Sequence, residues 1–583
     1  MLYLDDVYVA VPQELASSVL PLATSAFGPG LGATPGCGLT LRDDKCAAWC
    51  PSGEKPSGLP PLLQWQTSPL VVLGSALSDP DTALSEFLDA GVPVLPSAGQ
   101  TAHWELCASV ALEVGDKVMD LFWKRDVLST DQGEAVLNTV QCCQVLLRSC
   151  VETKLLHLLR AYSPDALGDR PRQLAVQLQD FWEELLECQL SSQDRLQMAL
   201  PVSRAGLGVG SLVLRHAAAF VGSWCLCLSP VLARLSAEDG AFLHSGLLGS
   251  GNSTTSLRVL GACECLQKQG VPVNKLPRWD LLASQSVQKA QRFFTRFCSL
   301  ALYKQLLSSS GVEGRARLRS CSGVGSGAFL VCAPSEAEGT ELVDAVFTHA
   351  VRWRLGLPVC AKDLFCQRFY SQGRRRQCRC ALDRFGDHLV CCGVGGHKIL
   401  LHSRIVAVLR GILRDSGAVV PDREVQVLAW GTRPGEAARL EIEFTVAGVR
   451  RFVDVVVKHP RARHVLASAA DKDGAAAAEG ELSKLRRYPA VPEAGLDTVL
   501  PFGVETFGRL GDSALRLLRA ARARVVSSDR RFDGWLGHLL VQRWHARLSC
   551  ALAAGLWEAA AASWGFSGAR AGLWDDAVDS RWC

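Results

Sequence analysis

The chain has 583 residues, of which 48% are hydrophobic and 21% are charged. This composition is typical of folded globular domains, and it excludes a long disordered chain, a single small domain and a disulfide-stapled mini-protein. The 62 basic and 58 acidic residues give a net charge of +4, so overall charge selects no class of partner. At roughly 100–200 residues per domain, the length predicts about three to five domains or subdomains.

Cysteine content and the first residues indicate the compartment. The 23 cysteines are too few for a disulfide scaffold in a chain of this length. Asp5 and Asp6 stand where a signal peptide needs an apolar run. We therefore expect an intracellular protein whose cysteines are reduced or bound to metal. The best membrane-span candidate, 216–233, contains His216 and Pro230, so a buried helix and no membrane partner are expected.

The first two thirds of the chain change from short strands to long helices. Residues 71–74 and 92–95 have the apolar, β-branched pattern of short strands. Apolar positions then recur at helical spacing. The segments expected to be mainly helical are 101–163, 173–195 and 212–330.

The last third differs from the rest in composition and in hydrophobic periodicity. Residues 366–398 are rich in Cys, His and Arg. Beyond them the periodicity alternates between strand and helix. The expected elements are, in order, a helix at 401–414, strands at 424–429, 438–446 and 451–458, a helix at 474–487, a strand at 498–505, a helix at 512–526 and a helical tail at 531–583.

Two adjacent carboxylates, Asp5 and Asp6, lie between strand-forming residues at the start of the chain. Carboxylates at a tight turn repel each other unless a cation lies beside them, and Mg²⁺ takes oxygen ligands and bridges phosphates. The pair is a candidate Mg²⁺ site. The alternative is an ordinary polar turn.

A second candidate metal site is the Cys/His cluster. Cys378, Cys380, His388 and Cys392 form a C-x-C-x₇-H-x₃-C pattern, and such spacing can close a tetrahedral, structural Zn²⁺ site. Cys391 competes with Cys392, and Cys360 and Cys366 are weaker substitutes. The alternative is a set of unrelated buried thiols.

The Cys/His cluster lies in basic sequence, which favours binding to a phosphate backbone over a merely solvated face. Two acids, Asp383 and Asp387, oppose the basic residues of 371–410. Those basic residues are Arg374, Arg375, Arg376, Arg379, Arg384, Lys398, Arg404 and Arg410.

A third candidate site lies in the strands after residue 400. Asp454 stands inside an apolar run, where a carboxylate is costly unless it is paired or bound to metal. Glu441 and Glu443 share one face of the preceding strand. An acid on each of two strands can hold Mg²⁺ or Mn²⁺ against a phosphate, with Lys458 or Lys484 stabilising charge.

Each of these acids also has a plainer interpretation. Asp454 could pair with Arg450 or Arg451, and the two glutamates could lie on an exposed strand face. Glu424 and Glu505 lie at strand ends, where they could join the site or serve the structure. The helix–three strands–helix–strand order fits the restriction-endonuclease-like, or PD-(D/E)xK, architecture.

Ordered phrases along the chain resemble the C-terminal part of non-LTR retrotransposon reverse transcriptases. The matching phrases are YLDD (3–6), GLTLRDDKC (38–46), GVPVLPSAGQ (91–100), HLLRAYSP (157–164), ALPVSRAGLGVGS (199–211), LDRFGDH (382–388), HSRIVAVL (402–409), RLEIEF (439–444), FVDVVV (452–457), AAAAEGELSKLRRY (475–488) and LPFGVETFG (500–508). The resemblance implies that Asp5 and Asp6 belong to a polymerase metal site and that Lys45 lies near the incoming phosphates. It also favours Cys392 over Cys391, and Lys484 with Tyr488 over Lys458.

The chain departs from the family pattern at several places. Glu441 replaces the usual Asp, and Val456 stands where a Lys is usual. The chain begins two residues before Tyr3, so the upstream polymerase motifs cannot be present and polymerase activity is not expected.

The resemblance implies a multidomain α+β protein. The expected parts are a reverse transcriptase palm remnant (1–100), a helical thumb and connector (101–365), a zinc knuckle (366–400), a restriction-endonuclease-like nuclease domain (401–526) and a helical tail (527–583). The implied function is metal-dependent nicking of target DNA by a nuclear protein that binds DNA and element RNA. The alternatives are a non-catalytic, zinc-dependent nucleic-acid-binding module and a decayed element.

Overall fold

A computed structural model describes residues 98–123, 138–249, 253–360, 364–369, 377–431, 433 and 436–564, together with single positions between 47 and 76. Asp5, Asp6, Lys45 and the expected strand at 92–95 lie outside the described residues. Near the N-terminus, β1 (Ala47–Ala48) pairs in parallel with β2 (Gln64–Trp65). The antiparallel pair β3 (Val71–Val72) and β4 (Ser75–Ala76) falls within the expected 71–74 region and just after it.

The chain forms two compact units, each built from separate stretches of sequence. The first unit comprises Met1–Ala111, Lys154–Gln173 and Arg215–Thr295, and the second comprises Leu112–Thr153, Leu174–Leu214 and Arg296–Cys583. All the candidate site residues from the Cys/His cluster onward belong to the second unit.

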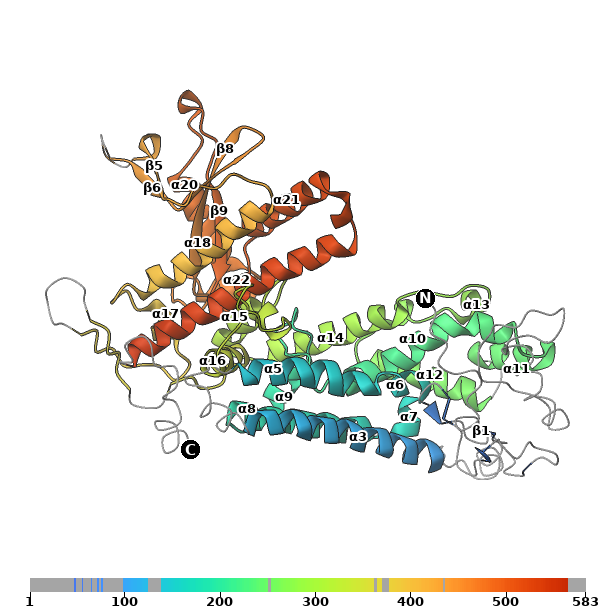
Figure 1. The fold of residues 1–583 in the computed structure, drawn as a ribbon. Helices are drawn as coiled ribbons and strands as arrows, with labels where there is room; N and C mark the ends of the chain where they lie inside the picture. The colour runs from blue at the N-terminus through green and yellow to red at the C-terminus, as the bar shows by residue number, and fades with distance from the viewer. Residues whose placement is uncertain are drawn as a thin grey trace, which may run out of the picture. The chain divides into compact units, whose positions relative to one another are not determined.

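The expectation of a mainly helical region before residue 360 is confirmed (Figure 1). Its α-helices are α3 (Ala98–Trp123), α5 (Thr139–Leu146), α6 (Leu158–Ala161), α7 (Pro164–Leu167), α8 (Arg170–Leu186), α9 (Ser192–Ala199), α10 (Leu212–Leu232), α11 (Ala237–Leu247), α12 (Thr254–Lys268), α13 (Trp279–Leu282), α14 (Ala290–Ser309), α15 (Val312–Cys321) and α16 (Asp344–Leu355).

Among the described helices, α10 alone has the length and apolar composition that a membrane span requires. Core helices of soluble proteins meet the same criterion. Ala218, Val221 and Leu228 are buried on α10. His216 is also buried, and its Nε2 lies 2.9 Å from the carbonyl oxygen of Tyr162.

The C-terminal third contains a small mixed sheet and the helices that pack on it. The helices are α17 (Asp387–Cys391), α18 (His397–Asp415), α19 (Leu466–Asp471), α20 (Ala475–Arg487), α21 (Asp512–Ser528) and α22 (Trp535–Ser563). The strands are β5 (Val425–Val427), β6 (Ala438–Leu440), β7 (Ile442–Val446), β8 (Val449–Lys458) and β9 (Leu500–Glu505). The elements expected between residue 400 and residue 564 are therefore present, with small differences at their ends, except that the strand expected at 438–446 is divided into β6 and β7. Residues 565–583 of the expected tail lie outside the described residues.

Strand β8 is the centre of the three-stranded sheet, whose order is β7-β8-β9. Strands β7 and β8 are antiparallel, and Val446 pairs with Val449 across a two-residue turn. Both turn residues, Ala447 and Gly448, have positive φ, as a tight hairpin with the right-handed strand twist requires. Strand β9 runs parallel to β8, so the chain needs a crossover between them, and α20 supplies it.

The expected single strand at 438–446 is wrong in one respect. The chain bends at Glu441, so β6 pairs with β5 whereas β7 pairs with β8. The periodicity continues through the bend because Leu440 and Ile442 are both fully buried, which is why the sequence suggests one strand. The bend places Glu441 between the two short strands.

One hydrophobic core runs through the sheet, the Cys/His cluster and the C-terminal helices. Helix α18 packs against α22, and the fully buried Trp544 lies on α22 (Figure 1). Cys366, Leu389 and Cys392 belong to the same core. The helix expected in the tail is therefore an integral part of this core.

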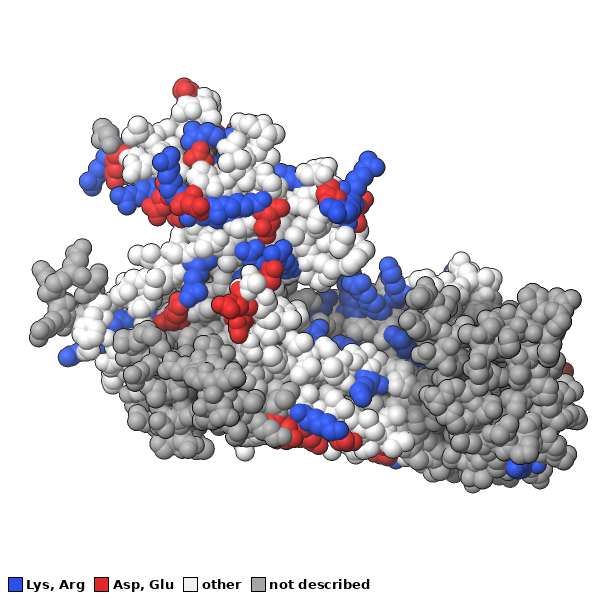
Figure 2. Space-filling view, viewed as in Figure 1, with Lys and Arg blue, Asp and Glu red and all other residues white. Residues whose placement is uncertain are grey.

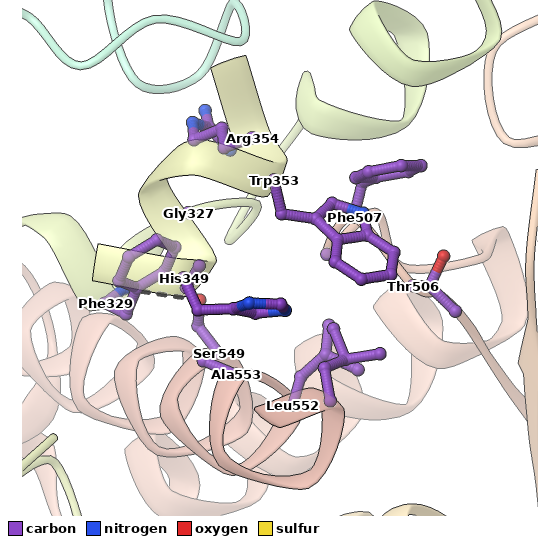
Figure 3. A pocket seen from close by; sticks show the side chains of 13 residues that line it. Gly327, Phe329, His349, Trp353, Arg354, Thr506, Phe507, Ser549, Leu552 and Ala553 are labelled. Atoms are coloured by element: carbon purple, nitrogen blue, oxygen red, sulfur yellow. Dashed lines mark hydrogen bonds between the residues drawn. The ribbon is translucent and has the colours of Figure 1, made fainter. Parts of the chain in front are cut away.

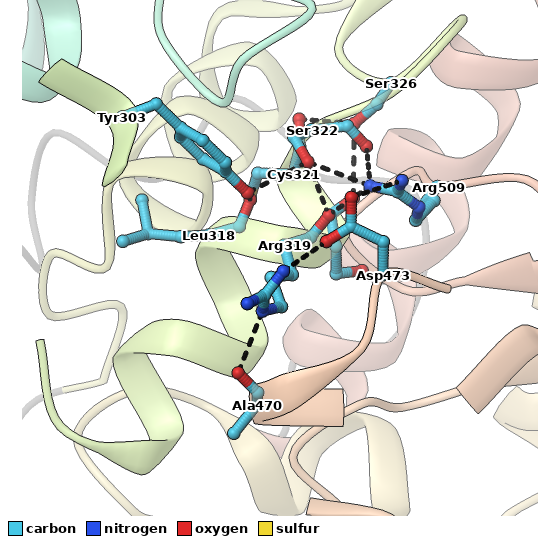
Figure 4. A network of polar contacts seen from close by, with 10 residues as sticks. Tyr303, Leu318, Arg319, Cys321, Ser322, Ser326, Ala470, Asp473 and Arg509 are labelled. Atoms are coloured by element: carbon cyan, nitrogen blue, oxygen red, sulfur yellow. Dashed lines mark hydrogen bonds and ion pairs between the residues drawn. The ribbon is translucent and has the colours of Figure 1, made fainter. Parts of the chain in front are cut away.

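Helix α15 is joined to the C-terminal third by a partly exposed polar network (Figure 4). Asp473 accepts from Arg319 at 2.7 Å and from Arg509 at 2.9 Å. Arg509 also donates to the carbonyl oxygens of Arg319 and Ser322. Because every guanidinium has an acceptor, the network stabilises this contact by satisfying partly buried charge.

Candidate metal centres

The first candidate centre consists of Cys366, Cys378, His388 and Cys392, whose ligand atoms all lie within 4.8 Å of one another. The Sγ of Cys392 is 3.7 Å from that of Cys378 and 4.0 Å from that of Cys366, and Cys378 Sγ is 3.5 Å from His388 Nε2. A tetrahedral zinc ion with bonds of about 2.0–2.3 Å separates its ligand atoms by roughly 3.5–3.8 Å. The group can therefore hold a zinc ion.

The observed group differs from the expected zinc ligands at one position, where Cys366 replaces Cys380. Cys380 lies outside this group and is exposed, whereas Cys366 is fully buried within it. The reason is the backbone at Arg379, whose φ of +54° breaks the two-residue alternation between Cys378 and Cys380. The segment 365–369 runs alongside, with the amide of Cys366 donating to the carbonyl of Cys380 at 2.9 Å.

Burial alternates along the segment around Cys366, but hydrophobicity does not, so the sequence carries no signal for this ligand. Phe365, Gln367 and Phe369 are exposed, whereas Cys366 and Arg368 are buried. Burial raises the pKa of the Cys366 thiol to about 11. A metal cation at this group would supply the positive charge that favours the thiolate.

A short loop before α17 positions His388. The carboxylate of Asp383 accepts from the amides of Phe385, Asp387 and His388 at 2.7–3.1 Å. Gly386 has φ of +81°, and a side chain there would meet Val359 and Trp353 at about 3 Å. The loop therefore requires an acid at Asp383 and a glycine at Gly386, the two positions that the LDRFGDH phrase supplies. Burial lowers the pKa of His388, which keeps the imidazole neutral, as a metal ligand must be.

The second candidate centre surrounds Asp454 on β8. Its side chain is 1% exposed. Lys484, on α20, lies 2.8 Å from each carboxylate oxygen. Thus the structure brings together the acid and the lysine that the sequence singled out. The alternative pairing of Asp454 with Arg450 or Arg451 does not occur, because these arginines pair with Glu443 and Asp497.

Glu441 lies beside Asp454, although it comes from the bend between β6 and β7. Its Oε2 accepts from the amide of Val455 at 3.3 Å. Burial, together with the neighbouring Asp454, raises the pKa of Glu441 to about 8. Two carboxyl groups so close cannot both ionise freely without a cation. This is the electrostatic arrangement that a divalent metal relieves.

His402 is the third member of this group, and sequence reasoning missed its role. The ligand atoms of His402, Glu441 and Asp454 lie within 4.8 Å of one another, and His402 Nε2 is 3.5 Å from Glu441 Oε1. His402 occupies the same stripe of α18 as Ile405 and Leu409, which are fully buried. A histidine on the core-facing stripe of an amphipathic helix is the signal that could have identified it.

The remaining candidates lie elsewhere in the second unit. Lys458 pairs with Glu479 at 2.8 Å instead of with Asp454. Glu505 is buried and accepts from the amides of Ala476 and Ala477, so it caps the N-terminus of α20. Its role is structural. Glu424 is exposed beside β5.

Exposed arginines lie on the elements next to Glu441 and Lys484. Figure 2 shows Lys and Arg side chains interleaved with Asp and Glu over the part of the surface that β5, β6 and α20 build. Arg439 on β6 and Arg486 on α20 are exposed, and Arg439 precedes Glu441 by two residues. Such cations beside a carboxylate pair favour a phosphate-bearing ligand.

A small buried cavity lies apart from the two candidate metal groups (Figure 3). His349, Trp353, Phe507 and Leu552 line it, and its volume is about 30 Å³. Burial lowers the pKa of His349 to about 3, so this ring is neutral. A cavity of this size holds about one or two water molecules, so it cannot admit a nucleotide.

No protein-family model matches the chain, and no curated protein matches it significantly. The arrangement of the residues above is therefore the basis for assigning a function.

Proposed function

We propose that this chain is the C-terminal part of a retrotransposon-type reverse transcriptase and that its last third is a metal-dependent DNA endonuclease. The observation that carries the proposal is the buried Asp454, held at 2.8 Å by Lys484 and accompanied by Glu441. A carboxylate pair can hold Mg²⁺ or Mn²⁺, which supplies Lewis-acid chemistry at a scissile phosphate.

The residues of the chain would divide the work as follows. Glu441 and Asp454 hold the cation. Lys484 stabilises negative charge that develops at the phosphate, as a cation fixed in a mostly buried site does. The exposed Arg439, two residues before Glu441, would contact a flanking phosphate of the DNA strand.

The order of elements supports a restriction-endonuclease-like architecture. Helix α18, the four strands β5 to β8, helices α19 and α20 and strand β9 follow each other along the chain, which matches the helix–three strands–helix–strand order if β6 and β7 are counted as one bent strand. The two acids lie at the bend before β7 and on the central strand β8, and the lysine comes from the crossover helix. These are the places from which side chains converge on one edge of a sheet.

The zinc-type cluster would serve as a structural brace. A group of four protein ligands has no open position for a substrate, so it stabilises the fold and presents the basic sequence around it. We propose DNA and element RNA as the partners, and the nucleus as the location. The polymerase residues Asp5, Asp6 and Lys45 lie outside the described residues, and no activity is proposed for them here.

A nicking assay tests the proposal. The full chain, loaded with zinc, is incubated with supercoiled plasmid and Mg²⁺ or Mn²⁺, alongside Glu441→Gln and its matched control Glu443→Gln. Glu443 lies two residues after Glu441, pairs with Arg450 of β8 and does not join the metal group. Nicking that is lost in the first variant and kept in the second supports the proposal. Equal nicking in both variants contradicts it.

A non-catalytic, zinc-dependent nucleic-acid-binding module is the second candidate. The observation that favours it is the full engagement of Asp454, since Lys484 contacts both of its carboxylate oxygens. A lysine that neutralises the acid can replace a metal in a site that has lost its chemistry. Salt-sensitive DNA binding by the wild-type chain without any nicking would favour this candidate.

A further inference from the structure

His402 projects from α18 toward the carboxylates of the proposed nuclease site. Its Nε2 lies 3.5 Å from Glu441 Oε1 and 3.1 Å from the carbonyl oxygen of Val455. The side chain is 26% exposed, so one part of the ring faces solvent while the other faces the acids. The ligand atoms of His402, Glu441 and Asp454 lie close enough to share one cation.

The packing of α18 fixes the position of His402. Ile405 and Leu409 follow at helical spacing and are fully buried against the sheet, so α18 cannot rotate without exposing them. Arg410, on the same helix, donates to the carbonyl oxygen of Glu441. Helix α18 therefore fixes both the imidazole and the bend that carries Glu441.

A purely structural role explains less of this arrangement. A histidine that only donated to the Val455 carbonyl would need no carboxylate beside it. Here the same Nε2 faces both the carbonyl and Glu441, and Asp454 completes the group. In the Nδ1–H tautomer the Nε2 lone pair is free for a cation, so metal binding would replace the hydrogen bond to Val455. One imidazole nitrogen beside two carboxylate oxygens is a ligand set that a divalent transition metal accepts.

We propose that His402 is the third protein ligand of the nuclease cation and that it makes the site select Mn²⁺ over Mg²⁺. This inference rests on the proposed function, because Glu441 and Asp454 supply the other two ligands. Mg²⁺ demands oxygen ligands in near-ideal octahedral geometry, whereas Mn²⁺ tolerates one nitrogen ligand beside its oxygen ligands. One nitrogen ligand thus disfavours Mg²⁺ while it leaves Mn²⁺ well coordinated.

Electron paramagnetic resonance of bound Mn²⁺ tests the proposal directly. The full chain is first loaded with one equivalent of zinc, which the thiolate-rich Cys366 cluster takes up, and Mn²⁺ is then added without free zinc or DNA. The expected result is a ¹⁴N coupling from a directly bound imidazole. In His402→Gln this coupling disappears and the Mn²⁺ affinity falls about tenfold or more, whereas the weaker Mg²⁺ affinity changes little.

The matched control is His464→Gln. His464 is 61% exposed, and its nearest carboxylate partner is Glu479 at 4.0 Å, away from the site. The control should keep both the coupling and the affinity. Retention of the nitrogen coupling in His402→Gln overturns the proposal, as does Mn²⁺ binding without any nitrogen coupling in the wild type.

Asp454→Asn separates this inference from the proposed function. If the wild type binds Mn²⁺ and Asp454→Asn does not, the two-carboxylate site stands, and only the nitrogen signal decides the role of His402. If the wild type binds no Mn²⁺, or if Asp454→Asn binds it equally well, the metal site itself fails and the inference fails with it.

Discussion

Asp387 and His459 join the zinc-type cluster to the strand that carries Asp454. Asp387 directly precedes the ligand His388, and its Oδ1 lies 3.1 Å from His459 Nε2 at the end of β8. His459 is buried, and its Nδ1 lies 2.7 Å from the hydroxyl of Thr506. Arg461 also contacts Asp387, at 3.1 Å. The zinc-type cluster is therefore tied by polar contacts to the end of the strand that carries Asp454.

Zinc should stabilise the whole second unit because of this connection. We expect about one tightly bound zinc ion per chain, and a chelator should lower the melting temperature. Cys366→Ser should lose the zinc, whereas Cys380→Ser should keep it, since Cys366 is buried in the group and Cys380 is exposed outside it. Metal analysis of the two purified variants measures this. Zinc loss in Cys380→Ser alone would restore the ligand set first expected from the sequence.

The metal affinity of the Asp454 centre should rise with pH. The pKa of Glu441 is raised to about 8 by burial and by Asp454, and its carboxyl must lose a proton to bind a cation. Below that pKa, Mn²⁺ affinity should increase by up to about tenfold per pH unit. Titration calorimetry between pH 6 and 9 measures this dependence. A pH-independent affinity would show that Glu441 is not a ligand.

The same pKa sets the sign of a stability effect without metal. The folded pKa of Glu441 lies above its ordinary value of 4.5, so the folded chain holds the extra proton between pH 4.5 and about 8. The free energy of unfolding contributed by this group therefore falls as pH rises through that window. Mn²⁺ should remove the effect, and so should Glu441→Gln, in thermal unfolding at matched pH values.

Removal of Lys484 should lower the stability of the fold as well as the proposed nuclease activity. Asp454 is buried, and Lys484→Ala would leave its charge without a partner, at a cost of about 3–5 kcal/mol in the free energy of unfolding. Lys458→Ala should cost about 1 kcal/mol or less, because Lys458 pairs with the half-exposed Glu479. Denaturant unfolding compares the two. A divalent cation should restore part of the stability of Lys484→Ala, and a similar small loss in both variants would argue against a buried charge pair.

The C-terminal helix α22 should be essential for stability. Trp544 is fully buried in the core that α22 shares with α18, so Trp544→Ala should cost about 3–5 kcal/mol. Leu539→Ala, on the same helix but 46% exposed, should change stability by less than about 0.5 kcal/mol. Thermal unfolding of the two variants tests whether α22 belongs to the core. Equal stability of both would make it peripheral.

Periodicity was enough to predict most of the C-terminal elements. Val453 and Val455 alternate with Asp454 along β8, and the sequence shows this pattern openly. The break at Glu441 was not predictable, because Leu440 and Ile442 are buried by different partner strands, and periodicity carries no information on pairing. The strand pairings that bring β6 and β8 together are properties of the tertiary fold.

The ligand groups were predictable in part. Asp454 and Lys484 stand out by residue type and position, and the structure places them in contact. Cys366 and His402 were harder to find because each comes from a segment whose approach depends on packing. The left-handed backbone at Arg379 removes Cys380 from the zinc-type group, and spacing alone cannot reveal such a turn.

The most direct test of metal-dependent DNA cleavage at the Asp454 centre is a plasmid-nicking assay. It compares the full, zinc-loaded chain with Asp454→Asn on supercoiled plasmid, in Mn²⁺ and in Mg²⁺. Asn keeps the shape of Asp454 and its buried position while it removes the charge that a cation needs. We predict that the wild type nicks the plasmid, faster in Mn²⁺, and that the nicking rate of the variant is at least about a hundredfold lower while it still binds DNA. Equal nicking by both proteins, or DNA binding by the wild type without any nicking, would contradict it.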